Sequence, residues 1–60
     1  MKIYYIIEHP FNGGYWSEEH NNWKGFLFAT NYSTIDAAKD RINNSISVAC
    51  KISIIYKSQP

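Results

Sequence analysis

Two histidines and one cysteine are the side chains of this 60-residue chain best suited to hold a metal ion. Structural zinc sites in small domains pair such ligands at spacings of about two to five residues. His9 and His20 lie eleven positions apart, and Cys50 is the only cysteine. We therefore predict no metal site and no cofactor, and we assign the Glu18-Glu19-His20 stretch to a solvated loop.

General acid–base chemistry needs a carboxylate or a histidine held beside its substrate, and nothing in the spacing of these residues fixes such a geometry. A domain with one helix and one sheet rarely encloses a pocket of about 300 Å³. Gly13-Gly14 precedes Tyr15-Trp16 and matches no phosphate-binding loop. Cys50 is expected to face the core as a small hydrophobe with a raised pKa. We therefore predict that the protein is not an enzyme.

Ten aromatic residues are more than one helix can cover, so some of their rings should stay partly exposed. Tyrosine and tryptophan are preferred anchors of protein interfaces. Two glutamates beside these rings would steer the surface toward a basic partner. The predicted partner-binding residues are Tyr15, Trp16, Glu18, Glu19, Trp23 and Phe26.

Single-stranded nucleic acid is the alternative partner, because exposed rings stack on bases while Lys2, Lys24 and Lys51 could meet phosphates. The charge balance argues against it. Six basic side chains face five acidic ones, and a formal net charge of +1 gives no basic surplus. Unpaired sheet edges would also allow a symmetric homodimer. We therefore favour a protein partner, and a metal-assisted enzyme ranks third.

The first half of the chain reads as a hairpin followed by irregular structure. Residues 2–9 are rich in β-branched and aromatic side chains and end at Pro10, which predicts a strand. Gly13 and Gly14 are expected to adopt positive φ, so that the chain returns through Tyr15 and Trp16. Residues 17–25 show no period and are predicted to form a loop or an irregular ribbon. Residues 26–29 are predicted to be a short strand or a segment packed on the core.

The second half reads as a helix and a strand. Ser33 or Thr34 can cap a helix over about residues 34–44, with Asp36 in its first turn. Its core-facing stripe comprises Ile35, Ala38, Ile42 and Ile46. A strand over residues 48–56 alternates Val48, Cys50, Ile52, Ile54 and Tyr56 toward the helix with Ala49, Lys51, Ser53 and Ile55 on the wet face.

These elements predict one two-layer α+β domain over residues 1–60, with residues 57–60 as a frayed tail. One helix packs on a three- to four-stranded, mainly antiparallel sheet in the order ββ(β)αβ. No run of about 18 apolar residues and no secretory signal is present, so we expect no membrane span and a cytoplasmic location.

The chain resembles the small ββαβ proteins of phage and prophage genomes through a spaced series of turn glycines, helix-entry residues and core apolar residues. The matching segments are Tyr4-Tyr5-Ile6-Ile7, Gly14-Tyr15-Trp16, Trp23, Phe28-Ala29-Thr30, Thr34-Ile35-Asp36-Ala37-Ala38 and Ile52-Ser53-Ile54-Ile55. The resemblance implies an accessory protein in the host cytoplasm. Some proteins of this kind act by binding and blocking a host enzyme, toxin or defence protein, so we expect an inhibitor or antagonist with a host or phage protein as partner.

Overall fold

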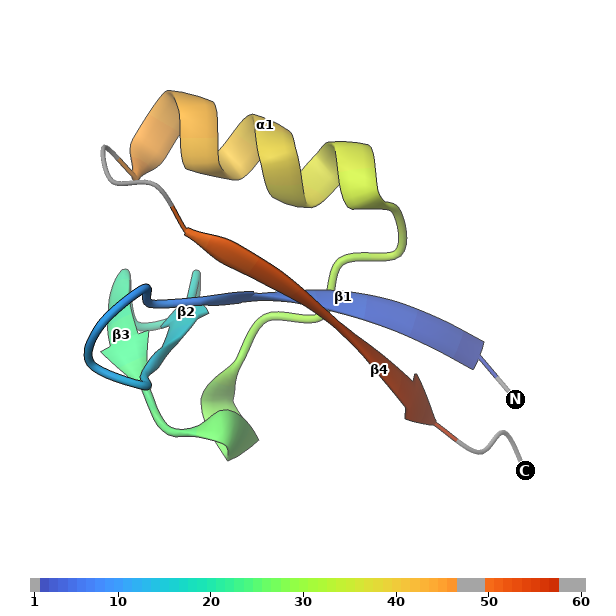
Figure 1. Ribbon diagram of the computed structural model, residues 1–60, viewed down its shortest axis with the longest axis horizontal. Coiled ribbons are helices and arrows are strands. Elements are labelled where there is room, and N and C mark those ends of the chain that lie inside the picture. The colour runs from blue at the N-terminus through green and yellow to red at the C-terminus, as the bar shows by residue number, and fades with distance from the viewer. Residues whose placement is uncertain (1, 47–49, 58–60) are drawn as a thin grey trace.

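The computed structural model describes residues 2–46 and 50–57 (Figure 1). Its strands form one antiparallel sheet in the order β3-β2-β1-β4. The predicted α+β class is confirmed, with the order βββαβ. The elements are β1 (Lys2–Glu8), β2 (Tyr15–Ser17), β3 (Asn22–Lys24), the 3₁₀ helix η1 (Phe26–Phe28), α1 (Ile35–Ser45) and β4 (Lys51–Lys57).

Strand β1 is central and has very different neighbours on its two edges. Along one edge it pairs with all of β4, from Lys2↔Lys57 to Glu8↔Lys51. On the other edge it pairs with β2 only at Glu8↔Tyr15. The connecting turn needs a left-handed residue, and Gly13 supplies it with φ of 75°. Gly14 does not have a positive φ, so the prediction was wrong there.

The chain from Thr30 to Tyr32, here called the bridging segment, fills the space where β1 and β2 diverge. The Tyr5 and Tyr32 N–H groups each donate to the other residue's carbonyl oxygen at 2.8 Å. The Thr30 N–H donates to the Trp16 carbonyl oxygen at 3.0 Å. The Thr30 Oγ1 accepts from the Glu18 N–H at 2.7 Å. The bridging segment therefore satisfies backbone groups of both strands that would otherwise lack partners.

Residues 17–25 are not a loop throughout, because β2 and β3 form a second hairpin. Trp16 lies opposite Trp23 in the register, and the Asn21 N–H donates to the Glu18 carbonyl oxygen at 3.3 Å across the turn. Asn21 has φ of 50°, a left-handed conformation that asparagine tolerates well. Strands of three residues are too short to show alternation, which is why the sequence pattern missed β3.

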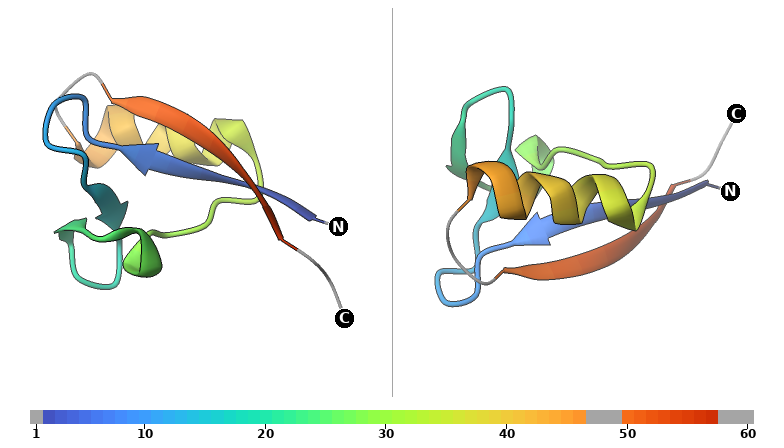
Figure 2. Two further views of the ribbon diagram at one scale, coloured as in Figure 1. Left: turned by 60° about the horizontal axis from the view of Figure 1, so that its bottom comes forward. Right: turned by 90° about the horizontal axis from the view of Figure 1, so that it is seen from above.

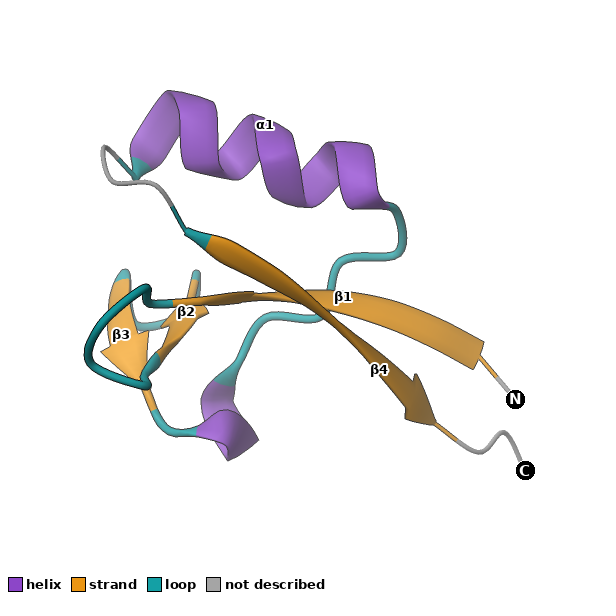
Figure 3. Cartoon of the chain, in the orientation of Figure 1, coloured by secondary structure: helices purple, strands orange, loops and turns teal. Residues whose placement is uncertain are grey.

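Residues 26–29 form neither a strand nor a segment buried in the core. The Phe28 N–H donates to the Gly25 carbonyl oxygen at 3.0 Å, and the Ala29 N–H donates to that of Phe26 at 3.1 Å. These i→i+3 bonds define the single-turn helix η1. It lies on the side of the sheet away from α1, as the small helix below the strands in Figure 3 shows.

Helix α1 confirms the predicted helix within one residue at its C-terminal end. The Thr34 Oγ1 accepts from the Ala37 N–H at 3.1 Å, and the acidic Asp36 lies in the first turn. Of the predicted stripe, Ala38 and Ile46 are buried and Ile42 packs against the core. Ile35 at the first helical position is 41% exposed, so the stripe does not extend to the helix N-terminus.

The core lies between α1 and the sheet, with Tyr5, Trp23, Ile42, Cys50 and Ile52 packed around it. Its buried members are Ile7, Trp16, Tyr32, Ala38 and Ile46. Burial of Cys50 raises the pKa of its thiol, as the sequence predicted. One helix face and one sheet face therefore meet through a small number of large side chains.

The strands extend beyond α1 and the edge strand β4 runs beside it (Figure 2), and this overturns part of the predicted alternation in β4. Strands of seven residues span about 23 Å, whereas a helix of 11 residues spans about 16 Å. The ends of β1 and β4 project past the helix (Figures 1 and 2). Ile54 and Tyr56, which were expected to lie under the helix, are 53% and 64% exposed. Cys50 and Ile52, nearer the start of the strand, do pack on the core.

The boundaries of β4 also differ from the prediction. The strand begins at Lys51 and includes Lys57, which was assigned to the tail. Val48, Ala49 and residues 58–60 of the predicted strand and tail lie outside the described residues. Within residues 2–46 and 50–57, no helix is long and apolar enough to cross a membrane.

The Thr34 cap gives a first prediction. Replacing the hydroxyl (Thr34→Ala) leaves the Ala37 N–H without its acceptor and should lower the free energy of unfolding by about 0.5–2 kcal/mol. Urea denaturation followed by circular dichroism measures this loss. The matched control is Ser33→Ala, which removes an exposed hydroxyl one residue earlier and should change stability by less than about 0.5 kcal/mol. Equal losses in the two variants would show that Thr34 is not the cap.

Candidate interaction surface and polar pocket

The two tryptophans among the predicted contact residues pack inside the β2–β3 hairpin. Trp16 is 8% exposed and belongs to the core. Trp23 is half-buried, with its ring centroid 5.4 Å from that of Trp16 and 4.7 Å from that of His9, both edge-on. Such contacts stabilise aromatic pairs beyond the area they bury. Trp16 is therefore withdrawn from the predicted contact surface.

Tyr15 and Phe26 meet on the other side of the sheet, where η1 packs on β2. Their ring centroids are 5.5 Å apart at an interplanar angle of 80°. Phe28 makes a similar edge-on contact with His20, at 5.2 Å. Each aromatic side chain of η1 is thus held from one side by a ring of the β2–β3 hairpin or its turn.

Leu27 lies between Phe26 and Phe28 in the sequence of η1, and its side chain is exposed to solvent. It is 91% exposed, and Phe26 and Phe28 are 53% and 56% exposed. Single exposed apolar residues are ordinary, whereas a contiguous group marks a site of interaction. We call Phe26, Leu27 and Phe28 the η1 patch. Sequence reasoning included Phe26 but missed Leu27 and Phe28, although the run of three large apolar residues after Gly25 was the available signal.

A hollow of about 220 Å³ adjoins the η1 patch and extends its apolar surface to the end of β4. Its rim carries a positive charge from Lys57, whose Nζ also lies 5.7 Å from the centre of the Tyr4 ring. The hollow is lined by Phe26, Leu27, Ala29, Asn31, Ile55 and Lys57. The contact surface available to a partner is therefore larger than η1 alone.

The predicted acidic residues occupy different environments. Glu18 accepts a hydrogen bond from the Arg41 Nη2 of α1 at 2.9 Å, which ties the start of the β2–β3 turn to the helix. Both side chains are more than one third exposed, and such pairs contribute less than about 1 kcal/mol to stability. Glu19 is exposed in the turn. The charge of Glu18 is therefore offset by Arg41, whereas Glu19 is exposed without an ion pair among those that the structure shows.

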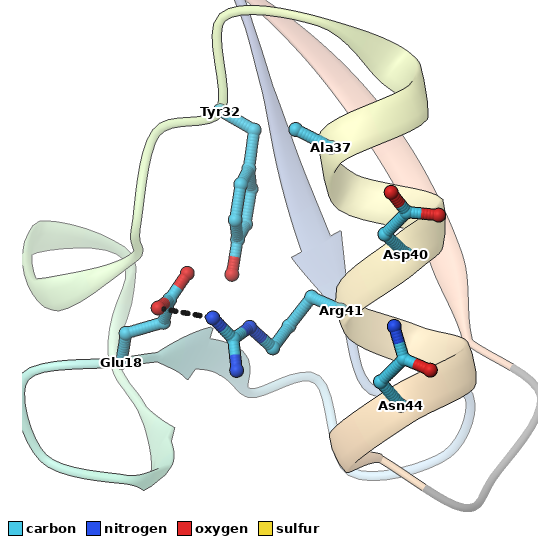
Figure 4. A pocket seen from close by; sticks show the side chains of 6 residues that line it. All are labelled: Glu18, Tyr32, Ala37, Asp40, Arg41 and Asn44. Carbon is cyan, nitrogen blue, oxygen red and sulfur yellow. Dashed lines mark hydrogen bonds and ion pairs between the residues drawn. The ribbon is translucent and has the colours of Figure 1, made fainter.

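The Glu18–Arg41 pair stands at one side of a second hollow, of about 420 Å³, between α1 and the β2–β3 turn. We call it the polar pocket (Figure 4). Its lining residues are Glu18, Tyr32, Ala37, Asp40, Arg41 and Asn44. The spacing of residues in the sequence could not predict this pocket, because its residues come from a turn, the bridging segment and a helix.

Tyr32 carries the most unusual group of the polar pocket. Its side chain is 8% exposed, and its hydroxyl is buried beside the Glu18 carboxylate and the Arg41 guanidinium. The hydroxyl points toward the space between Glu18 and Arg41 (Figure 4). Burial raises the pKa of Tyr32 well above its ordinary value of 10.0, the Glu18 carboxylate raises it further, and the Arg41 guanidinium opposes the shift.

The residues considered for metal binding lie in separate surroundings. The His9 Nδ1 accepts hydrogen bonds from the Phe11 and Asn12 N–H groups, both at 3.1 Å, while His20 packs on Phe28. Among residues 2–46 and 50–57, no three histidine, cysteine or acidic side chains lie close enough together to hold a metal ion.

Comparisons of the chain with protein families, with curated proteins and with solved structures found no match. The resemblance to small phage proteins therefore stays a prediction. The functional argument consequently depends on the chain itself, above all on the η1 patch.

The buried Tyr32 hydroxyl gives a second prediction. Because its pKa is raised in the folded state, the unfolded chain loses this proton first as the pH rises through about 10, so alkali should destabilise the fold. Below that pH the phenol is protonated in both states and has no effect on pH dependence. We expect the free energy of unfolding to fall less steeply from about pH 9 to about pH 11 in Tyr32→Phe than in the wild type.

Urea denaturation across that range measures both slopes. Subtracting the slope of Tyr32→Phe from that of the wild type removes the contribution of the lysines and of the other tyrosines, which both proteins share. Identical slopes would show that the Tyr32 hydroxyl ionises as easily in the folded protein as in the unfolded chain.

Proposed function

We propose that this protein binds a partner protein through the η1 patch and thereby covers a working surface of that partner. The observation that carries the proposal is the exposure of three consecutive large apolar side chains, with Leu27 at 91%. Water contact with this group is unfavourable in the free protein. Binding in an apolar groove on a partner would remove these three side chains from water.

The magnitudes indicate what such an interface needs. Burying a leucine or phenylalanine side chain contributes about 1.5–3 kcal/mol. The η1 patch is already half-covered at its two rings, so it supplies only part of the roughly 4–15 kcal/mol that association costs. The adjoining hollow, with Ile55 and Lys57, gives the partner the additional area. We therefore place the interface on η1 and the neighbouring end of β4.

Two of the three side chains of the η1 patch already have ring contacts before a partner binds. Phe26 and Phe28 are held edge-on by Tyr15 and His20, so little side-chain freedom is lost in a complex. Of the residues predicted from the sequence, Tyr15 and Phe26 stay in this surface, with Tyr15 as a support. Glu19 lies in the turn that also carries His20 and remains a candidate for electrostatic steering.

Occlusion is the mode of action that fits a domain of this size. A 60-residue chain offers a rigid binding face, and its bound bulk is enough to block access to a cleft on the partner. We propose a host protein as the partner and the host cytoplasm as the setting, consistent with the resemblance to phage accessory proteins. No catalytic step by this protein is part of the proposal.

Substitution at Leu27 tests the proposal. Tagged protein is used to capture partners from a nuclease-treated host lysate, and the captured protein is then purified and titrated by calorimetry. Leu27→Asp should weaken binding by tenfold or more, because interface anchors contribute about 2 kcal/mol or more each. Circular dichroism should show an unchanged fold, since Leu27 is almost fully exposed.

The matched control is Phe11→Asp. Phe11 is 90% exposed in the turn after β1, so the substitution places the same charge on an equally exposed apolar residue outside the η1 patch. Its affinity should stay within about threefold of wild type. Equal effects of the two substitutions would contradict the proposal. So would a capture that recovers no protein from the treated lysate and only nucleic acid from a parallel untreated one.

A further inference from the structure

The end of the sheet that adjoins the η1 patch carries Lys2 and Lys57, and neither forms an ion pair among the described residues. We propose that the partner segment bound at this surface is acidic. An apolar side chain of the partner fills the hollow beside η1, and an adjacent aspartate or glutamate pairs with the two lysines. This inference rests on the proposed function, because it specifies the partner of the same surface.

Lys2 and Lys57 lie directly opposite each other at the ends of β1 and β4. Opposite residues of an antiparallel pair project from the same face, with Cβ atoms about 5 Å apart. Lys57 lines the hollow together with Ile55 and Leu27, so this shared face is the one toward η1. Like charges placed opposite each other are unfavourable for folding. A carboxylate between the two ammonium groups would replace this repulsion by two attractions.

The acidic side chains of the described residues lie elsewhere. Glu8 is at the far end of β1, about 20 Å from Lys2 along the strand. There it faces Lys51 and accepts a hydrogen bond from the Ser53 hydroxyl at 3.2 Å. Glu18 is paired with α1, and both aspartates belong to α1, on the other side of the sheet from η1. Charges are screened over about 8 Å in physiological salt, so Glu8 does not neutralise the lysine end.

Glu19 lies toward the other end of η1. It precedes His20, whose ring contacts Phe28, whereas Leu27 lines the hollow with Lys57. The surface therefore has opposite charges at its two ends, and the basic end is the one beside the apolar hollow. The partner chemistry inferred for this end differs from the basic surface that the two glutamates alone would attract.

The lining of the hollow suits a peptide better than nucleic acid. Its walls are apolar apart from Asn31 and Lys57, and its volume is about 220 Å³. Leu27 and Ile55 present no ring face on which a base could stack. The exposed Asn31 side chain offers N–H donors and a carbonyl acceptor, which can pair with the carbonyl and N–H groups of a peptide backbone. A chain with apolar and acidic residues side by side therefore matches this lining.

Amide NMR with three synthetic peptides tests the inference. The probe is acetyl-Glu-Leu-Leu-Glu-Leu-Leu-Glu-amide. One control replaces its glutamates by lysines, and the other replaces its leucines by serines. We expect saturable shifts at Leu27, Ala29 and Ile55 with the probe. Both controls should bind at least about tenfold more weakly, because the first repels the lysines and the second has no apolar side chain for the hollow.

Removal of the two lysine charges provides the variant. Lys2→Gln/Lys57→Gln should weaken binding of the probe about fivefold or more at low salt. It should not lower the midpoint of thermal unfolding, since it removes a pair of like charges. The matched control is Lys39→Gln/Lys51→Gln, which removes the same net charge from α1 and from the far end of β4. Its affinity for the probe should stay within about twofold of wild type.

The outcomes separate this inference from the proposed function. The acidic partner would be overturned by equal binding of the glutamate and lysine peptides, by the absence of saturable shifts with the probe, or by equal losses in the two double variants. Tighter binding of a thymidine oligonucleotide, or of phosphatidylserine vesicles, than of the probe would overturn it as well. In each case the effect of Leu27→Asp on a captured protein still decides whether the η1 patch binds a partner.

Discussion

The hydrogen bonds of the bridging segment are the constraint on which the rest of this structure depends. Thr30 binds the backbone of β2 on one side, and Tyr32 exchanges two hydrogen bonds with Tyr5 of β1 on the other. The bridging segment thus connects β1 and β2, which pair directly with each other at a single residue position. Its hydrogen bonds also fix what comes before and after it in the chain. Helix η1 ends at Phe28, two residues before the bridging segment, on one side of the sheet. The Thr34 cap, two residues after the bridging segment, starts α1 on the other side.

The η1 patch and the polar pocket both follow from that arrangement. Because η1 lies just before the bridging segment in the chain, its two phenylalanine rings contact the β2–β3 hairpin and its turn, and Leu27 is exposed to solvent. Because Tyr32 belongs to the bridging segment, its ring enters the core and its hydroxyl reaches the polar pocket under the Glu18–Arg41 pair. One short segment thus places an apolar contact surface on one side and a polar hollow on the other.

The exposed apolar residues of β4 differ from those of the η1 patch in whether they favour an interaction site. Ile54 and Tyr56 are exposed because β4 is an edge strand that runs beside α1, as the view from above in Figure 2 shows. Their strand lies at the sheet edge and carries Lys51 and Lys57 at its two ends. In a self-pairing centred on Ile54, each Lys51 would face the Lys57 of the second copy, and charged ends of this kind discourage edge association. The η1 patch, by contrast, is a 3₁₀ helix and has no strand edge to protect.

The sequence predicted the parts of the fold that depend on local signals. Thr34 and Asp36 marked the start of α1, and the β-branched run before Pro10 marked β1. It failed where structure depends on distant partners. Strand β3 is too short to show a pattern, and Trp16 became a core residue because its ring packs on Trp23 of β3 and belongs to the core cluster with Tyr32. For the same reason the polar pocket could not be inferred.

Burial of Ile54 was predicted wrongly because alternation gives the face of a residue but not which strands the helix covers. Leu27 and Phe28 were missed because four apolar residues fit a strand, a buried turn or an exposed 3₁₀ helix equally well. Only the contacts of Phe26 with Tyr15 and of Phe28 with His20 decide between these alternatives.

The central claim is that the η1 patch is the surface that binds a partner protein. Amide NMR of the isotope-labelled protein, free and in complex with the purified partner, tests it most directly. The account predicts that the largest shifts fall at Phe26, Leu27 and Phe28 and at the neighbouring Ile55. A complex that leaves these amides unchanged and instead perturbs Ile3 and Tyr56, on the uncovered end of the sheet, would contradict it.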